Sequence, residues 1–237
     1  MLSSVQNALR LIRQFSPEDP VLGVSEISRR MRLPKSTVSR LLGTLHAEGF
    51  VAHAGARGYR LLRHDRLREA AAAELLSLRN QTGETAHLTV LDQTDAVCIA
   101  FLAADEMWQT FNSAGFRMAA HASSSGKVLL AYAPSADVES AIARGLEPLT
   151  PRTIVDPDAF RAALRQIRAD GIAMSRDEGV VGHVGIAAPV FDESGTAVGA
   201  LSVVSRTQRT SPAVAAQHAA LLQAAGMSVS RKLGFSG

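Results

Sequence analysis

The sequence predicts an α+β fold in two parts, a small basic helical part followed by a larger part built on antiparallel strands. Positive charge gathers in the first 68 residues, where apolar residues recur at helical spacing in three consecutive segments. Beyond residue 84, short apolar runs come in pairs separated by turn residues, and helical segments lie between the pairs. Strand pairs interspersed with helices are typical of α+β domains with an antiparallel sheet.

Composition narrows the class of protein. Of 237 residues, 46% are apolar and 20% are charged, which allows a buried core and argues against long disordered tails. No run approaches about 20 consecutive apolar residues, so we expect no membrane span, and the amphipathic N-terminus is unlike a secretory signal. The single cysteine, Cys98, excludes an intrachain disulfide and a cysteine-based zinc site, and in "DAVCIAF" it is interpreted as a small buried apolar residue. These features predict a cytoplasmic protein.

Charge is divided unevenly along the chain. Residues 1–68 carry 12 Lys and Arg against 5 Asp and Glu, a net charge of +7. The remaining residues carry 13 against 17, a net charge of −4, and the two parts give the overall +3. A small basic segment on a larger acidic one indicates a polyanion-binding module joined to a second domain.

Residues 1–61 have the element order of a winged helix-turn-helix domain. One apolar stripe predicts a first helix, and a second short helix around Ile27 and Met31 ends before the tight turn "RLP". Pro34 suits the first turn of a third helix, which is expected to run to about His46 with Gly49 as its terminator. The segment "FVAHAGARGYRL" then predicts two short strands around a loop.

The third helix carries the residue types of DNA recognition. Val38, Leu41, Leu42 and Leu45 lie on its apolar stripe, whereas its other face offers only hydroxyls and cations. In this class of domain that face lies in the major groove, where Ser, Thr, Lys and Arg bind phosphate oxygens and base edges. A merely solvated face is the alternative, and the turn, the hairpin and the local charge together disfavour it. The predicted DNA contacts are Arg32, Lys35, Ser36, Thr37, Ser39 and Arg40, with Arg57 and Arg60 on the hairpin.

Residues 62–83 predict a linker helix. The segment "RHDRLREAAAAELLSLRNQTG" places Leu67, Ala71, Leu75 and Leu78 at helical spacing, with Gly83 as a stop. A flexible spacer is the alternative, but alanine is the best helix former, so a helix is favoured.

Residues 84–237 predict the second domain. Two hairpins are expected, "TAHLTVLD" with "DAVCIAFLA" and "HVGIAAPVFD" with "TAVGALSVVS". Helices are expected in "SGKVLLAY" and "SADVESAIARG", between the cap Asp156 and the terminator Gly171, and from Ser211 to about Leu233.

The segment "SSSGK" leaves one enzymatic alternative. Ser124 and Lys127 fit the S-x-x-K motif of penicillin-binding enzymes, which would make the chain a hydrolase, but the companion motifs S-D-N and K-T-G are absent. A phosphate-binding P-loop would need glycine where His121 stands. His87, His121 and His183 have no metal-ligand spacing, so we expect no metal, no cofactor and no catalytic residue.

An ordered series of segments resembles the IclR family of bacterial transcriptional regulators. The series begins with "VSEISRRMRLPKSTVSRLLGTLHAEGFV" and continues through "TGETAHLTVLD", "HASSSGKVLLAY", "GLEPLTPRTIVDPDAFRAALRQIRADGIAMSRDE" and "AAPVFDESGTAVGALSV". The resemblance implies a winged helix-turn-helix domain, a connecting helix that is shorter here than usual, and a GAF-like domain that senses a small metabolite. It also implies a homodimer or a dimer of dimers. One short helix and a wing offer little surface, so paired DNA-binding domains on double-stranded DNA with a palindromic operator are expected.

The resemblance also implies an effector site. Carried over position by position, its contacts are Ser124, Ser125, Ser175, Gly185 and Ser202, with Met107 or Trp108 as a lid.

Three positions of that site depart from the family's usual residues. The family often has a cysteine or polar residue where Gly185 stands, an acid where Ser175 stands and a hydroxyl where Val204 stands, which favours a larger or less polar ligand than a two-carbon acid. Hydroxyls at a helix N-terminus favour the carboxylate or carbonyl end of an organic acid or related compound, and Val184, Ile186 and Val204 are expected to offer apolar contact. The alternative is a C-terminal domain that only mediates assembly, without an effector.

Overall fold

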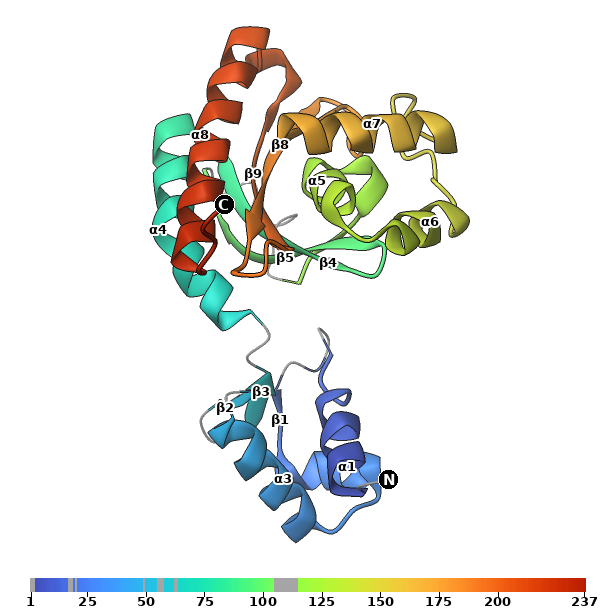
Figure 1. Cartoon of the computed structure of the whole chain (residues 1–237), viewed down its shortest axis with the longest axis vertical. Helices are drawn as coiled ribbons and strands as arrows, with labels where there is room; N and C mark the ends of the chain where they lie inside the picture. The colour runs from blue at the N-terminus through green and yellow to red at the C-terminus, as the bar shows by residue number, and fades with distance from the viewer. Residues whose placement is uncertain are drawn as a thin grey trace. The chain divides into compact units, whose positions relative to one another are not determined.

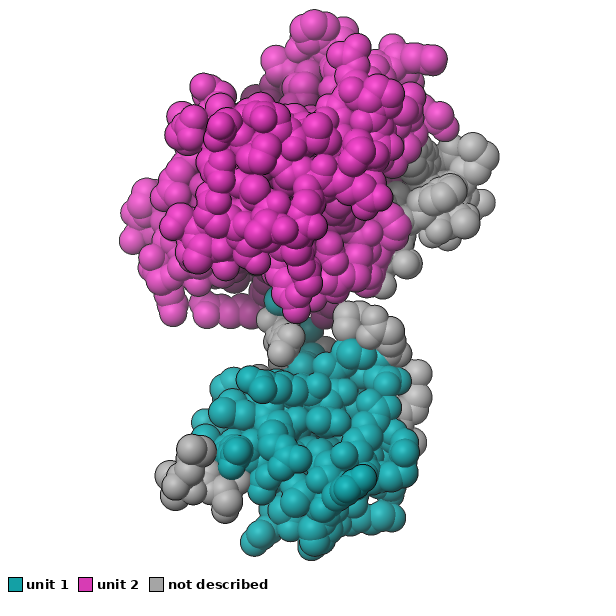
Figure 2. All heavy atoms as spheres, turned by 90° about the vertical axis from the view of Figure 1, so that its right-hand side faces the viewer, with its two compact units in different colours: residues 1–65 teal, residues 66–237 magenta. Residues whose placement is uncertain are grey.

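The chain forms two compact units in the computed structural model (Figure 1), which describes residues 3–16, 19, 21–48, 50–54, 58–61, 64–104 and 115–237. The units are Met1–Asp65 and Arg66–Gly237, coloured separately in Figure 2. Each unit has its own apolar core.

The smaller unit is a winged helix-turn-helix. Its described helices each turn one apolar face to a shared core, in which Leu11, Ile27, Val38 and Leu42 are fully buried. Behind them lies a small antiparallel sheet in the order β1-β3-β2. The elements are α1 (Ser3–Ile12), β1 (Val21–Leu22), α2 (Val24–Met31), α3 (Lys35–Ala47), β2 (Val51–His53) and β3 (Tyr59–Leu61).

The predicted helices and hairpin of this unit are confirmed, and β1 is an addition. Val21 pairs with Arg60 and Leu22 pairs with Tyr59. A strand of two residues has no periodicity, so the sequence carries no signal for it. The predicted helix terminator, Gly49, lies outside the described residues.

The larger unit is built on one antiparallel sheet, so the predicted α+β fold is confirmed. Within the described residues, six strands follow the order β6-β5-β4-β9-β8-β7. Its elements are α4 (Asp65–Thr82), β4 (Thr85–Asp92), β5 (Asp95–Leu102), β6 (Arg117–Ala119), the 3-10 helix η3 (Ala120–Ala122), α5 (Ser124–Tyr132), α6 (Ser135–Ala143), α7 (Pro157–Asp170), β7 (Ala173–Arg176), β8 (His183–Phe191), β9 (Ala197–Arg206), the 3-10 helix η4 (Thr207–Arg209) and α8 (Pro212–Lys232).

Local sequence signals place the turns and helix ends of this unit. The β4–β5 hairpin turns at Gln93, which takes a positive φ of 58°. The side chain of Asp156 accepts a hydrogen bond from the Ala159 amide at 2.8 Å and so caps α7. Gly171 ends that helix in the left-handed region, at φ 68°. The two predicted hairpins, this helix and the closing helix α8 are confirmed.

Helices cover both faces of the sheet (Figure 1). On one face, α4 and α8 lie side by side, joined by hydrogen bonds from Ser228 to Glu74 and from Lys232 to the Ala70 carbonyl. On the other face, α5 packs against the sheet and against α7. The helix expected over residues 62–83 is α4, and its predicted apolar stripe is buried in the larger unit's core: Leu67, Ala71, Leu75 and Leu78.

Candidate functional site

The exposed face of α3 presents the predicted DNA-contacting groups. Val38, Leu42 and Leu45 are buried, which turns the opposite side of the helix to solvent. Within the described part of the chain, Lys35 and Arg40 make no ion pair. Side chains that are both cationic and uncommitted are suited to phosphate oxygens and base edges. The exposed predicted residues are Arg32, Lys35, Ser36, Ser39 and Arg40, and Thr37 is half-buried.

The turn before α3 is fixed by local hydrogen bonds. Arg32 adopts the left-handed region at φ 55° as the C-cap of α2. The Ser28 hydroxyl donates to the Leu33 carbonyl at 2.6 Å, and the Leu33 amide donates to the Ser28 carbonyl at 3.2 Å. These bonds hold the two helices of the motif in one geometry, which sets the direction of the exposed face of α3.

The two arginines within α2, Arg29 and Arg30, form ion pairs with acidic residues. Glu26 accepts hydrogen bonds from Arg29 and Arg30, which lower the pKa of its carboxyl to about 2. Arg30 also pairs with Asp19 at 2.7 Å. Of the predicted wing residues, Arg60 lies on β3 opposite Ala52 and Val21. Arg57 lies outside the described residues.

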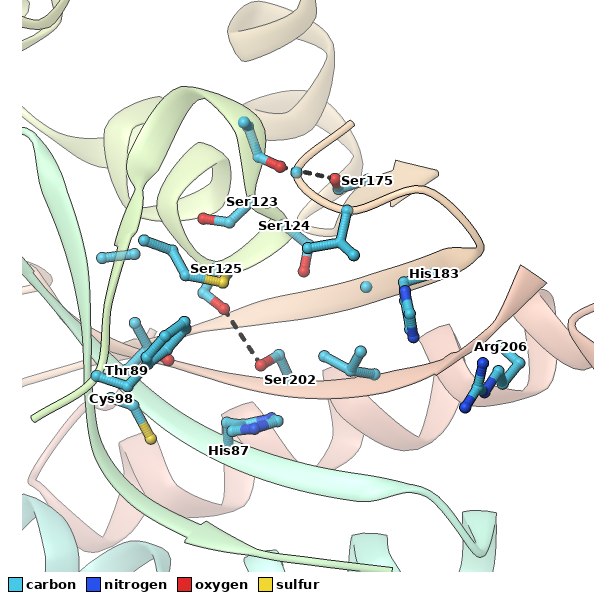
Figure 3. A pocket seen from close by; sticks show the side chains of 18 residues that line it. His87, Thr89, Cys98, Ser123, Ser124, Ser125, Ser175, His183, Ser202 and Arg206 are labelled. Atoms are coloured by element: carbon cyan, nitrogen blue, oxygen red, sulfur yellow. Dashed lines mark hydrogen bonds between the residues drawn. The ribbon is translucent and has the colours of Figure 1, made fainter. Parts of the chain in front are cut away.

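A cavity of about 460 Å³ lies between the start of α5 and the sheet in the larger unit. Five residues predicted as effector contacts border it, although they come from four separate elements (Figure 3). These residues are Ser124 and Ser125 of α5, Ser175 of β7, Gly185 of β8 and Ser202 of β9. The proposed lid residues, Met107 and Trp108, lie outside the described residues.

The serines have different partners. The Ser125 hydroxyl donates to that of Ser202 at 3.2 Å, and the Ser175 hydroxyl donates to the Ala122 carbonyl at 3.0 Å. Ser123 is the cap of α5, since its hydroxyl accepts from the Gly126 amide at 3.1 Å. Ser124 and Ser125 are therefore the first two residues of the helix, where amides lack partners in the preceding turn.

Gly185 leaves space for the Ser124 hydroxyl. A β-carbon at position 185 would lie 2.7 Å from Ser124 Oγ, which is closer than such atoms approach. Figure 3 shows the Ser124 side chain extending from α5 toward this strand. A side chain at position 185 would displace the hydroxyl and fill part of the cavity.

The predicted apolar contacts of the pocket are partly wrong. Val204 borders the cavity, but Val184 and Ile186 are fully buried in the core on the opposite face of the sheet. Successive side chains of a strand point to opposite faces, so the neighbours of Gly185 must point away from the pocket.

The same alternation identifies pocket residues that the sequence analysis missed. On β4, His87 and Thr89 face the cavity, whereas Leu88 faces the core. The alternation of polar and apolar residues in "TAHLTV" is the signal that marks a strand with a polar-lined cavity on one side. The other missed residues are Ala96, Cys98, Phe116, Met118, Ala122, Ser123, Gly179, Val180, His183 and Arg206.

The pocket has chemically different parts. His183 and Arg206 are paired across β8 and β9 and lie together at one end of the cavity (Figure 3). The hydroxyls of Ser125 and Ser202 lie at another part of the wall. Burial raises the pKa of the Cys98 thiol to about 11, so Cys98 lines the pocket as a thiol and not as a reactive thiolate.

Lys127 is bound to Glu178 and to the backbone, and not to Ser124. Its ammonium lies 2.6 and 2.8 Å from the two carboxylate oxygens of Glu178 and 2.8 Å from the Met174 carbonyl oxygen. Burial lowers the pKa of Lys127, and the neighbouring Glu178 carboxylate acts in the opposite direction. The lysine of the S-x-x-K motif is thus held in a buried ion pair and is not placed as the base that this motif would supply to Ser124.

The three histidines weighed as metal ligands in the sequence do not all lie together. His121 Nε2 is 2.9 Å from the Glu147 carbonyl oxygen, whereas His87 and His183 border the pocket. Among the described residues, no three His, Cys, Asp or Glu side chains are grouped so as to hold a metal ion. No helix in the described part of the chain is long and apolar enough to cross a membrane.

A winged helix-turn-helix with a cationic recognition helix, joined to a domain with a pocket of small-molecule size, defines a DNA-binding transcriptional regulator. The family model of the IclR helix-turn-helix domain matches residues 4–55. That of the bacterial transcriptional regulator IclR C-terminal domain matches residues 59–231. The chain belongs to the IclR family of transcriptional regulators, as its resemblance implied, and it is a regulator and not an enzyme.

Individual relatives are similar over most or nearly all of this chain. The transcriptional regulator XynR of Escherichia coli K12 is 31% identical, covering 99% of this chain and 98% of XynR. The transcriptional repressor IclR of the same organism is 29% identical over 85% of this chain and 79% of its own. The crystal structure of an IclR homologue from Microbacterium hydrocarbonoxydans complexed with 4-hydroxybenzoate has a TM-score of 0.66 and 25% identity, covering 97% of this chain and 98% of that chain.

Proposed function

We propose that the larger unit binds a small organic acid or related carbonyl compound, and that binding alters the affinity of the smaller unit for its operator. The observation that carries this proposal is the convergence of Ser124, Ser125, Ser175, Gly185 and Ser202 on one cavity of about 460 Å³. A cavity of this size is in the range of small-molecule sites. As a DNA-binding regulator, the protein would act in the cytoplasm.

The wall chemistry favours a ligand with a polar end and an apolar body. The start of α5 favours a carboxylate or carbonyl oxygen, because its amides and hydroxyls are hydrogen-bond donors. Phe116, Met118, Val180 and Val204 supply apolar surface for the remainder of the ligand. The cavity is too large for a two-carbon acid to fill, and the 4-hydroxybenzoate complex of the Microbacterium homologue supports an organic acid of greater size.

The proposed response runs through the two faces of one sheet. The pocket lies on the α5 face of the sheet, and α4, the first helix after the smaller unit in the chain, packs on the opposite face. If ligand binding changes operator affinity, operator binding must change ligand affinity by the same factor.

A thermal-shift screen of carboxylic acids and their amides tests the pocket, since a ligand of the native state raises the melting temperature. A hit must then change the affinity of the full chain for a DNA duplex that the chain has enriched from a randomised pool. If no compound in the screen raises the melting temperature and no metabolite changes DNA binding, the alternative is favoured in which the C-terminal domain only mediates assembly.

We also propose that a homodimer, alone or as a dimer of dimers, binds a palindromic operator. One three-turn recognition helix contacts few base pairs, so paired units are needed for operator-level affinity. Half-sites should be separated by about 10–10.5 base pairs or a multiple of that spacing. Footprinting that shows one asymmetric half-site bound by a monomer would contradict this.

A further inference from the structure

Gly43 is an interior residue of the recognition helix, and no contact among the described residues requires a glycine there. It is exposed, and a β-carbon added there would meet no atom within 4 Å. Its φ lies outside the left-handed region, so no turn calls for glycine. The helix continues for four residues to Ala47, with Glu48 as its C-cap, so Gly43 is not a helix terminator either.

Glycine at such a position weakens the helix. It loses more backbone freedom on folding than any other residue, and only proline is less favourable in a helix interior. Alanine would fit here without any internal clash and would stabilise the helix. With no internal contact among the described residues to explain the missing side chain, the position points to a contact outside the chain.

The position of Gly43 on the helix indicates which contact. At about 3.6 residues per turn, Gly43 lies one turn after Arg40 and two turns after Ser36 on the same row. That row is opposite the buried Val38, Leu42 and Leu45. It is the row of α3 farthest from the core of the smaller unit, and in a helix-turn-helix domain such a row faces the floor of the major groove.

We propose that Gly43 is a specificity-determining residue of operator recognition. Its bare backbone allows α3 to lie against the edge of a base pair in the major groove, while Arg40 reaches along the groove to an adjacent base. The edges exposed there include the C5-methyl group of thymine, which needs space and offers apolar contact. Gly43 thus acts by permitting close approach to bases, and it makes no contribution to phosphate binding.

The test uses a series in which helix propensity and side-chain size rank differently. Gly43→Ala, Gly43→Ser and Gly43→Leu should all raise the melting temperature of the full chain, in the order Ala, Leu, Ser, with a rise of about 4 °C for Ala if the smaller unit melts separately. Affinity for a duplex enriched by the wild-type chain from a randomised pool should instead fall with size, by about tenfold for Ala and most for Leu.

Two controls separate base contact from other effects. A scrambled duplex of the same composition should bind all variants equally, because phosphate contacts do not depend on the base sequence. Ser140→Ala, at an exposed position of α6 in the larger unit, should leave both DNA affinities unchanged.

Each other outcome overturns the proposal. Unchanged or tighter binding of the enriched duplex by Gly43→Ala would show that no base lies against this position. An equal loss on both duplexes would assign the effect to phosphate contacts. A melting temperature that does not rise in Gly43→Ala would show that the glycine satisfies an internal requirement.

Discussion

Replacing Lys127 with methionine should be one of the most damaging single substitutions in the larger unit. Its ammonium lies within 2.8 Å of three oxygens, two from Glu178 and one from the Met174 carbonyl. The side chains of Lys127 and Glu178 are only 3% and 11% exposed, so water cannot replace the lost cation. Removing one partner of a buried ion pair costs about 3–5 kcal/mol. That is a large part of the roughly 5–15 kcal/mol by which a domain is stable.

The double variant Lys127→Met/Glu178→Met should recover most of that loss. Two apolar side chains of similar length remove the uncompensated charge, and such replacements of buried pairs are often neutral or stabilising. Urea unfolding of the full chain, followed by circular dichroism, measures both variants. A loss below about 1 kcal/mol in the single variant, or a double variant no more stable than the single one, would refute this reasoning.

The same pair should affect the pocket rim. Glu178 precedes Gly179 and Val180, which border the cavity, and its backbone carbonyl accepts hydrogen bonds from the Thr150 and Thr153 hydroxyls. The double variant should therefore remain folded but bind a ligand found in the thermal-shift screen more weakly than the wild type. Calorimetry measures that difference. Equal ligand affinity in the double variant and the wild type would show that the Lys127–Glu178 pair contributes to stability and not to ligand binding.

Three further predictions concern both units. Arg40→Ala should relax base specificity and weaken operator binding by about 1–3 kcal/mol, whereas Lys35→Ala should weaken binding to all sequences and flatten the salt dependence of that binding. Gel shifts measure both variants, and unchanged affinity of both at low salt would contradict the DNA-contact assignment. Gly185→Leu should abolish effector binding in calorimetry while leaving DNA binding intact, because its β-carbon would lie 2.7 Å from Ser124 Oγ and the rest of its side chain would fill the cavity. Burial lowers the pKa of His218, so its neutral form stabilises the fold above the unfolded pKa of about 6.5, and stability is lost as the pH falls below it. His218→Leu should flatten this dependence in melting curves from pH 8 to 5, and an unchanged slope would assign it to other groups.

The sequence alone determined the local elements, because their signals lie within a few residues of one another. A stripe at helical spacing marked α4, and Asp156 and Gly171 marked the two ends of α7. The polar face of α3 indicated the DNA-binding helix, because burial of the apolar face turns the polar face to solvent. The pocket residues came from the family resemblance and not from periodicity.

Tertiary structure alone decided what depends on residues far apart in the chain. Ser125 meets Ser202 across 77 positions, and Lys127 finds Glu178 across 51, distances over which no periodic pattern extends. The direction of Val184 and Ile186 needed the register of β8, because a strand shifted by one residue would turn the opposite side chains to the pocket. Sheet order and register are set by packing summed over the whole unit. The helices and strands could therefore be predicted from the sequence, whereas the faces that line the cavity depend on the assembled sheet.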